Sequence, residues 1–117
     1  MPKVMIIDDD RTTVTLLKTL LEMDGFDVVL VPRGSMVMDK AHEENPDIFL
    51  VDYHLSDMEG TTVTKNLRAD SQFANKPIVM ASGLNVEDEA KAVGVNVFLV
   101  KPFEPGSLAG IFNKLLS

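Results

Sequence analysis

Five short apolar runs, each separated from the next by a segment with helical spacing, constrain the fold of this chain more than any other feature of its sequence. Each run is continuous rather than alternating and is rich in β-branched residues, which is typical of strands covered on both faces. The five predicted strands are Val4–Ile7, Val28–Val31, Ile48–Val51, Ile78–Ala81 and Val97–Val100. With 117 residues the chain fits one domain, which we expect to span residues 1–117.

The segments between and after the strands predict five helices. Asp10 is expected to cap the first helix, and Gly25 stands where its C-terminal cap belongs. The other helices are expected after Gly34, near Gly60, after Asn85 with a capping box formed with Asp88, and from Pro105 towards Leu116. This alternation predicts an α/β fold, a single doubly wound five-stranded parallel sheet in the flavodoxin-like order 2-1-3-4-5, with helices on both faces.

Composition and charge exclude several classes of protein. The chain has no Cys, which excludes disulfides and thiolate metal sites. Its net charge of -7 disfavours direct binding to a nucleic acid. The apolar runs are too short to cross a bilayer, and the first one is too short for a signal peptide. We therefore expect a cytoplasmic protein that does not bind membranes.

Reactive side chains follow four of the five predicted strands. Asp8 and Asp9 come after the first strand, Asp52 after the third, Ser82 after the fourth and Lys101 after the fifth. Ligands of open α/β sheets bind outside the carboxyl ends of the strands, where the strand order reverses. In the order 2-1-3-4-5 only the edge strand 2 lacks a reactive residue at its end. We expect three carboxylates, a hydroxyl and an ammonium to converge on one site.

Three carboxylates held close together repel one another, so such a site must either take up protons or bind a cation. Oxygen ligands without Cys, close to a phosphate, suit Mg²⁺. Three carboxylates, one Mg²⁺ and the ammonium of Lys101 sum to zero charge, and a neutral site is able to accept a phosphoryl group. One carboxylate then acts as the nucleophile, while Lys101 and Ser82 bind the phosphoryl oxygens.

Four motifs carry a resemblance to a known family. They are Asp8-Asp9 after an apolar strand, the segment Asp52–Gly60, Ser82-Gly83, and Lys101-Pro102-Phe103. In this order, each at its own strand end, they resemble the receiver domain of bacterial two-component response regulators. The resemblance runs from Val4 to the last helix.

The resemblance implies a role for each site residue. Asp52 corresponds to the phosphoacceptor, which receives its phosphoryl group from the phosphohistidine of a histidine kinase. Asp9 corresponds to a direct Mg²⁺ ligand and Asp8 to a ligand through water, with Asp52 and the main-chain carbonyl of His54 completing the set. Lys101 pairs with the phosphate, and its peptide bond to the following proline is expected to be cis.

The same resemblance implies a switch. Ser82 takes the position of the switch hydroxyl, and Phe98 takes the aromatic switch position. The domain would change the surface formed by helix 4, strand 5 and helix 5, through which it controls a downstream effector. It is then not an enzyme in the usual sense, because it catalyses only its own aspartyl phosphorylation and slow autodephosphorylation.

Several residues depart from the family pattern or tune it. Ser56 stands where the family usually has Pro, which loosens the loop after the acceptor. Phe98 lacks the hydroxyl of a tyrosine, so its two rotamers differ in packing only. His54 and Leu84 occupy the positions two residues beyond acceptor and switch, which tune the phosphoryl lifetime in the family.

Two other functions compete with this one. In a small phosphohydrolase similar to the haloacid dehalogenases, Asp8 would be the nucleophile and Asp10 the general acid, but Asp52 would have no clear role. In a pseudo-receiver, the chain would dock to partners without accepting phosphate. We interpret Asp10 as a helix cap, and Asp57 and Glu59 as loop charges outside the site.

The expected partners are a histidine kinase or phosphotransfer protein and a downstream effector protein or domain. The sequence stops just after the last helix, which fits a free-standing regulator, a phosphorelay intermediate or one domain of a longer protein. Helix 5 carries Lys114 as its only charge after Glu104. A monomer and a weak dimer are therefore both expected states.

Overall fold

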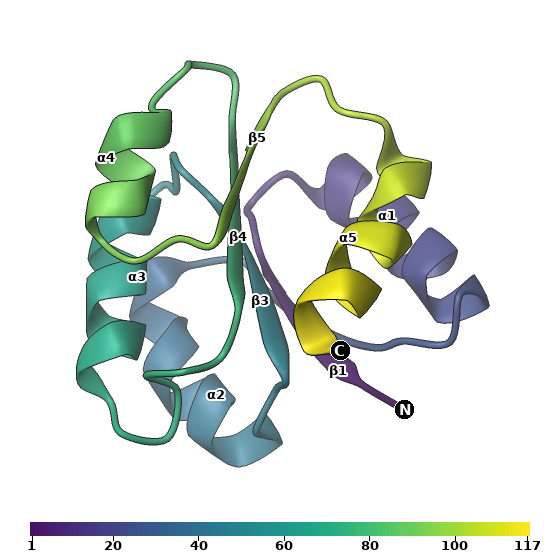
Figure 1. Cartoon of the computed structure of the whole chain (residues 1–117), viewed down its shortest axis with the longest axis horizontal. Coiled ribbons are helices and arrows are strands. Elements are labelled where there is room, and N and C mark those ends of the chain that lie inside the picture. The colour runs from purple at the N-terminus through teal and green to yellow at the C-terminus, as the bar shows by residue number, and fades with distance from the viewer.

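The computed structural model describes residues 1–117 and contains one five-stranded sheet with five α-helices around it (Figure 1). All neighbouring strands are parallel, in the order β2-β1-β3-β4-β5. This confirms the predicted fold class and strand order. The elements are β1 Lys3–Ile7, α1 Arg11–Met23, β2 Asp27–Val31, η1 Gly34–Met36, α2 Val37–Glu44, β3 Ile48–Asp52, α3 Gly60–Ala69, β4 Ile78–Ser82, α4 Glu87–Ala92, β5 Val97–Val100, η2 Pro105–Ser107 and α5 Leu108–Leu116, where η marks a 3-10 turn.

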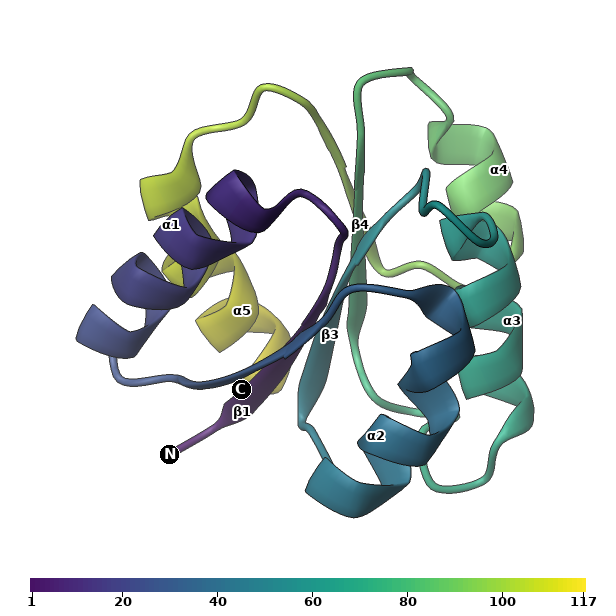
Figure 2. The same cartoon turned by 180° about the vertical axis from the view of Figure 1, so that it is seen from behind.

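The sheet lies between two layers of helices. Helices α1 and α5 cover one face, and α2, α3 and α4 cover the other (Figures 1 and 2). Each layer encloses its own buried apolar cluster, with Phe26 against Phe112 on the first face and Phe49 against Phe73 on the second. The strands supply alternate residues to the two clusters, which explains their continuous apolar runs. None of the helices combines the length and the apolar character needed to span a bilayer.

The register of the strands brings their carboxyl ends to one edge. Ile7 pairs with Val51 across β1 and β3, and Asp52 pairs with Ala81 across β3 and β4. The strand order reverses between β1 and β3, because β2 lies outside β1 and the later strands lie on the other side. The crevice of an open α/β sheet forms at this point. The side chains that follow β1, β3, β4 and β5 therefore share one end of the molecule.

The helix boundaries differ from the sequence expectation at three places. The second and fifth helices each begin with a 3-10 turn, η1 and η2, before the α-helix starts. The capping box predicted for α4 is wrong: Val86 occupies the N-cap, and no side chain caps the helix. Asn85 instead accepts a hydrogen bond of 3.5 Å from the N–H of Glu87, in a local side-chain turn. The cap predicted for α1 is confirmed, because the Asp10 side chain accepts from the N–H of Thr13.

A single guanidinium joins two loops at the opposite end of the sheet. Arg68, in the last turn of α3, donates from Nε and Nη2 to the carbonyl of Gly94 at 3.0 and 2.8 Å. Its Nη1 donates to the carbonyls of Ala74 and Lys76, at 3.0 and 2.7 Å. The group has no carboxylate partner: its donors satisfy main-chain acceptors outside the helices and strands, and Nη2 also donates to Oδ1 of Asn96 at 2.9 Å. Arg68 therefore holds the α3–β4 and α4–β5 loops together.

Replacing Arg68 tests this role. We expect Arg68→Met to lower the free energy of unfolding by about 2–4 kcal/mol, because several half-buried carbonyls lose a charged donor at once. Lys65→Met, on the same helix but exposed and without a hydrogen bond, is the matched control and should change little. Urea denaturation followed by circular dichroism measures both. Equal stabilities of the two variants would contradict the assignment.

The loop after β3 is anchored by a carboxylate that the sequence suggested was only a loop charge. Asp57 accepts hydrogen bonds from the main-chain N–H groups of Gly34 and Ser35, each at 2.9 Å, and so caps the turn η1. These N–H groups lower the pKa of Asp57 from its ordinary value of 3.8. Asp57 thus lies outside the carboxylate cluster, as expected, but it fastens the acceptor loop to the start of α2.

This cap predicts a pH-dependent contribution to stability. Folding lowers the pKa of Asp57, so its ionised form stabilises the fold above pH 3.8, and the contribution is lost as the pH falls through the lowered pKa. We expect Asp57→Ala to melt at a lower temperature than the wild type at pH 7, with the difference closing under acid. Ser56→Ala, next to it and exposed, is the control. A difference that stays constant down to strongly acidic pH would rule out a role for the charge.

Candidate functional site

Three carboxylates meet at the point where the strand order reverses. Asp8 and Asp9 follow β1, and Asp52 is the last residue of the adjacent strand β3. One oxygen from each of the three lies within 4.8 Å of the others. Asp8 is buried, Asp52 is half-buried and Asp9 is exposed, so the cluster opens to solvent on one side. The structure thus brings together the three acids that the sequence predicted.

Lys101 is the only cation that contacts this cluster. Its Nζ lies 3.1 Å from Oδ1 of Asp52 and 3.5 Å from Oδ2 of Asp8. Burial disfavours the ammonium, but the charges and hydrogen bonds of Asp8 and Asp52 outweigh this effect and raise the pKa of Lys101. Its main-chain N–H donates to the carbonyl of Ser82 at 2.7 Å, which fixes the residue next to β4. The peptide bond from Lys101 to Pro102 is cis, as expected.

The electrostatics of Asp52 are unfavourable without a further cation. Burial raises the pKa of Asp52, the charges of Asp8 and Asp9 raise it further, and Lys101 only partly opposes them. With one ammonium against three carboxylates, the cluster keeps an excess of two negative charges. A divalent cation would remove this excess, and the all-oxygen donor set suits Mg²⁺.

Asp10, the next acid along the chain, is directed to a different task. Its Oδ2 accepts from the hydroxyl of Thr13 at 2.7 Å, which completes the cap of α1. Its main-chain N–H donates to Oδ1 of Asp8 at 2.9 Å and so helps to orient that carboxylate. The pair Asp8 and Asp10 therefore does not form the two-carboxylate centre that a haloacid-dehalogenase-like hydrolase requires.

Ser82 and Phe98 lie on the strands beyond the carboxylates. Ser82 ends β4, is buried, and accepts a hydrogen bond of 3.0 Å at Oγ from the N–H of Leu84. It makes no hydrogen bond to the three carboxylates. Phe98 on β5 pairs with Met80 and packs, half-buried, against the core on the α2, α3 and α4 face.

His54 lies in the loop after the acceptor strand. Its side chain is exposed, and its ring meets the ring of Tyr53 edge-on, with centroids 4.7 Å apart. An isolated bridge pairs its main chain with Glu59. The ring lies outside the carboxylate cluster, so the predicted contribution of His54 rests on its carbonyl.

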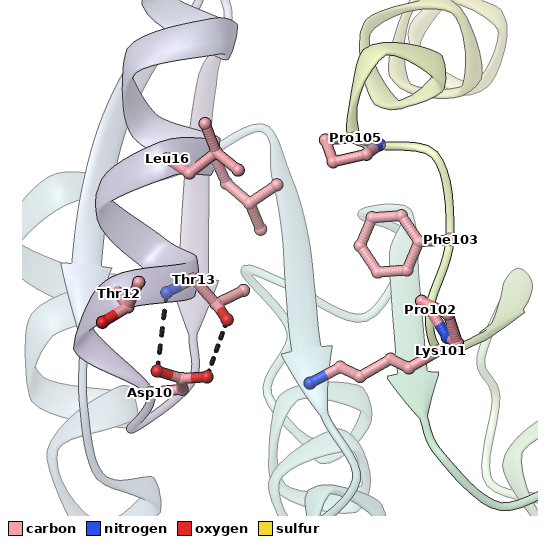
Figure 3. A pocket seen from close by; sticks show the side chains of 9 residues that line it. Asp10, Thr12, Thr13, Leu16, Lys101, Pro102, Phe103 and Pro105 are labelled. Atoms are coloured by element: carbon pink, nitrogen blue, oxygen red, sulfur yellow. Dashed lines mark hydrogen bonds between the residues drawn. The ribbon is translucent and has the colours of Figure 1, made fainter.

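A cavity of about 460 Å³ opens beside Lys101 (Figure 3). Leu16 on α1 forms one wall, and Phe103 in the loop after β5 and Pro105 at the start of η2 form the other. Asp10 and Thr13 border it on the α1 side, joined by the two hydrogen bonds of the helix cap. The charged site is therefore flanked by an apolar groove.

Sequence reasoning missed one contact close to Asp52. Tyr53 is buried, and its hydroxyl donates to both carboxylate oxygens of Glu89, each at 3.0 Å. The hydrogen bond to Glu89, burial and the nearby charge of Glu59 raise the pKa of Tyr53 to about 12, so the phenol stays protonated at neutral pH. The partners are 36 residues apart, and no local motif signals such a pairing.

This parallel α/β sheet, with an acidic cluster and a lysine at its switch point, is the arrangement of a known class of signalling domain. The family model of the response regulator receiver domain matches residues 4–113. The chain belongs to this family.

Individual relatives agree with this assignment. The chain is 33% identical over 106 residues to the alkaline phosphatase synthesis transcriptional regulatory protein PhoP of Bacillus subtilis, covering 88% of this chain and 43% of that protein. It therefore spans less than half of this relative. Among solved structures, chemotaxis protein CheY4 of Vibrio cholerae superposes with a TM-score of 0.92 at 29% identity, covering 99% of both chains. The BeF3-activated N-terminal receiver domain of Klebsiella pneumoniae RstA superposes with a TM-score of 0.87 at 27% identity, covering 97% of both chains.

The repulsion within the cluster leads to a stability prediction. Folding raises the pKa of Asp52, so its ionised form opposes folding at pH 7. We expect Asp52→Asn to have a higher free energy of unfolding than the wild type in EDTA. Added Mg²⁺ should reduce this difference in the free energy of unfolding, because Mg²⁺ binding stabilises the wild type more than the variant.

Urea denaturation at pH 7 with EDTA or MgCl₂ measures both effects. Asp88→Asn, which removes an exposed carboxylate on α4, is the control and should respond equally in the two buffers. A variant at position 52 that is less stable than the wild type in EDTA would mean that the attraction to Lys101 exceeds the repulsion.

Proposed function

We propose that this receiver domain accepts a phosphoryl group on Asp52 from the phosphohistidine of a histidine kinase or phosphotransfer protein. The proposal rests above all on one observation: three carboxylates lie within 4.8 Å of one another, with the Lys101 ammonium 3.1 Å from Asp52. This arrangement has excess negative charge that a divalent cation is suited to neutralise. It combines a carboxylate nucleophile with a cation that stabilises the charge of a transferred phosphoryl group.

Asp52 is the proposed nucleophile because it is the carboxylate that Lys101 approaches most closely. One of its oxygens bonds to phosphorus while the phosphorus–nitrogen bond of the donor breaks, and the leaving imidazole nitrogen keeps the electron pair and takes up a proton. Lys101 is placed to neutralise the charge that develops on the phosphoryl oxygens. Hydrolysis of the acyl phosphate by water then returns the carboxylate slowly.

The proposed Mg²⁺ ligands are Asp8, through water, Asp9 and Asp52, with the main-chain carbonyl of His54. All of these donors are oxygen, which matches the preference of Mg²⁺. When bound, the ion would supply electrostatic stabilisation of the phosphoryl oxygens. Asp8 is further oriented by the N–H of Asp10, at 2.9 Å, and is held near Lys101.

The signal is proposed to leave the site through Ser82 and Phe98. Ser82 is the last residue of β4, directly before the loop that leads to α4, and its hydroxyl is held only by the N–H of Leu84. Moving this hydroxyl to the phosphoryl group would displace that loop and repack Phe98. The resulting surface of α4, β5 and α5 would then bind an effector. RstA, a relative in fold, has a receiver domain that is described as activated by BeF3.

A pseudo-receiver that only docks to partners is the remaining alternative. The complete acid set and the paired Lys101 favour phosphoryl transfer over docking alone. PhoP is more than twice as long as the region it shares with this chain, so the output of the whole protein is also a proposal.

Phosphorylation by a small donor tests the function. We expect acetyl phosphate with Mg²⁺ to add one phosphoryl group to the intact chain, and EDTA to abolish the addition. Asp52→Asn should gain no mass, because the nucleophile is missing. Intact-protein mass spectrometry, followed by peptide mapping after borohydride trapping, measures the addition and its position.

Two variants separate this function from its competitors. Asp10→Asn keeps the carboxylate cluster and should still be phosphorylated, whereas a haloacid-dehalogenase-like mechanism would require Asp10. A label on Asp8, or one that survives in Asp52→Asn, would contradict the proposal. A wild-type chain that gains no mass under any Mg²⁺ concentration would favour a docking module.

A further inference from the structure

The only phenol in the chain belongs to Tyr53, directly after Asp52. Its ring is buried on the α2, α3 and α4 face, and its hydroxyl donates to both oxygens of Glu89, at 3.0 Å each. Glu89 lies in the first turn of α4. One bifurcated hydrogen bond therefore links the residue after the proposed phosphoacceptor to α4. This helix lies on the outside of the sheet (Figure 1).

Tyr53 is a rigid anchor for this link. Its main-chain N–H donates to the carbonyl of Ala81 on β4 at 2.9 Å, and its own carbonyl accepts from the N–H of Gly60 on α3 at 2.6 Å. A side chain at position 60 would collide with the carbonyl of Asp52 and crowd the backbone of Tyr53, so the start of α3 packs directly against this segment. Tyr53 is therefore fixed to two elements besides α4.

Helix α4, in contrast, is weakly attached. It has six residues, no side chain caps it, and Ala90 is its only buried residue. Its remaining side-chain hydrogen bonds are local: the Lys91 ammonium donates to the carbonyl of Asn96, in the loop that follows the helix, and the N–H of Glu87 donates to the side chain of Asn85. The bond from Tyr53 to Glu89 is thus the one side-chain hydrogen bond that ties α4 to a distant part of the fold.

The two ends of this bond differ in their access to water. Glu89 is exposed, so its carboxylate regains hydration as soon as it is released. The Tyr53 ring is buried, but its hydroxyl lies at the edge of the core and has a second acidic neighbour in Glu59, whose charge contributes to its raised pKa. Breaking the bond therefore leaves neither group isolated in an apolar environment, and the link is reversible.

We propose that the hydrogen bond between Tyr53 and Glu89 is a latch that holds α4 in its unphosphorylated position and opens on phosphorylation. This inference rests on the proposed function, in which the Ser82 hydroxyl leaves the N–H of Leu84 for the phosphoryl group. That step shifts the loop leading into α4, while Tyr53 stays fixed to Ala81 and Gly60. The first turn of α4 then moves away from the phenol.

The latch has a thermodynamic consequence. A bond that exists only in the unphosphorylated form favours that form, so removing it raises the population of the active form. A phosphoryl mimic should then bind more tightly. For one hydrogen bond to a partly solvated carboxylate, we expect about a three- to tenfold gain in affinity.

Binding of BeF3⁻ in the presence of Mg²⁺, measured by calorimetry, tests the latch. We expect Tyr53→Phe, which removes only the hydroxyl, and Glu89→Ala to bind BeF3⁻ more tightly than the wild type. The double variant should bind no more tightly than either single variant, because both remove the same bond. Glu87→Ala, in the same turn but without a bond to Tyr53, is the matched control and should leave the affinity unchanged.

Hydrogen exchange of the free protein supplies a second readout. Amides of α4 should exchange faster in Tyr53→Phe than in the wild type, while those of the central strands should not change. If the bond were purely structural and present in both forms, Tyr53→Phe would speed exchange in α4 but leave the BeF3⁻ affinity unchanged. That result, or weaker BeF3⁻ binding by Tyr53→Phe, would overturn the latch and leave the proposed function intact. A wild-type chain that binds no BeF3⁻ would instead overturn the proposed function itself.

Discussion

Mutual repulsion among three carboxylates is the constraint on which the chemistry of this domain depends. Asp8, Asp9 and Asp52 lie within 4.8 Å of one another because β1 and β3 are neighbours at the switch point of the sheet. Burial and the neighbouring charges raise the pKa of Asp52, and Lys101 compensates for only part of the charge. The fold therefore holds three carboxylates in a cluster that is unfavourable by itself and becomes favourable when a cation binds. A site strained in this way is ready for a divalent ion and a phosphoryl group.

The rest of the molecule supports this arrangement from a distance. The two apolar clusters hold the strands in register, and the register places the acids and the lysine at one edge. Asp57 fastens the acceptor loop to η1, and Arg68 joins the loops at the far end of the sheet. Helix α4 has one buried residue, no side-chain cap and one long-range side-chain hydrogen bond, so we expect it to move most readily.

The sequence predicted the sheet and the cluster for the same reason. Runs such as Ile78–Ala81 are apolar throughout because strands covered on both faces leave no polar position, and a residue that follows such a strand must lie at its carboxyl end. The predicted start of α4 was wrong because the Asn85 side chain forms a local turn and does not cap the helix. The hydrogen bonds of Arg68 to Gly94 and of Tyr53 to Glu89 were not predicted. Their partners lie 26 and 36 residues apart in the sequence, so tertiary packing brings them together and no local sequence pattern indicates the pairing.

A crystal structure of the chain grown with Mg²⁺ and BeF3⁻ places this mechanism under direct test. We expect one metal ion in contact with the carboxylates of Asp9 and Asp52, beryllium bonded to an oxygen of Asp52, and the Lys101 ammonium in contact with a fluoride. Beryllium bonded to Asp8, or a metal ion bound away from the three carboxylates, would contradict it.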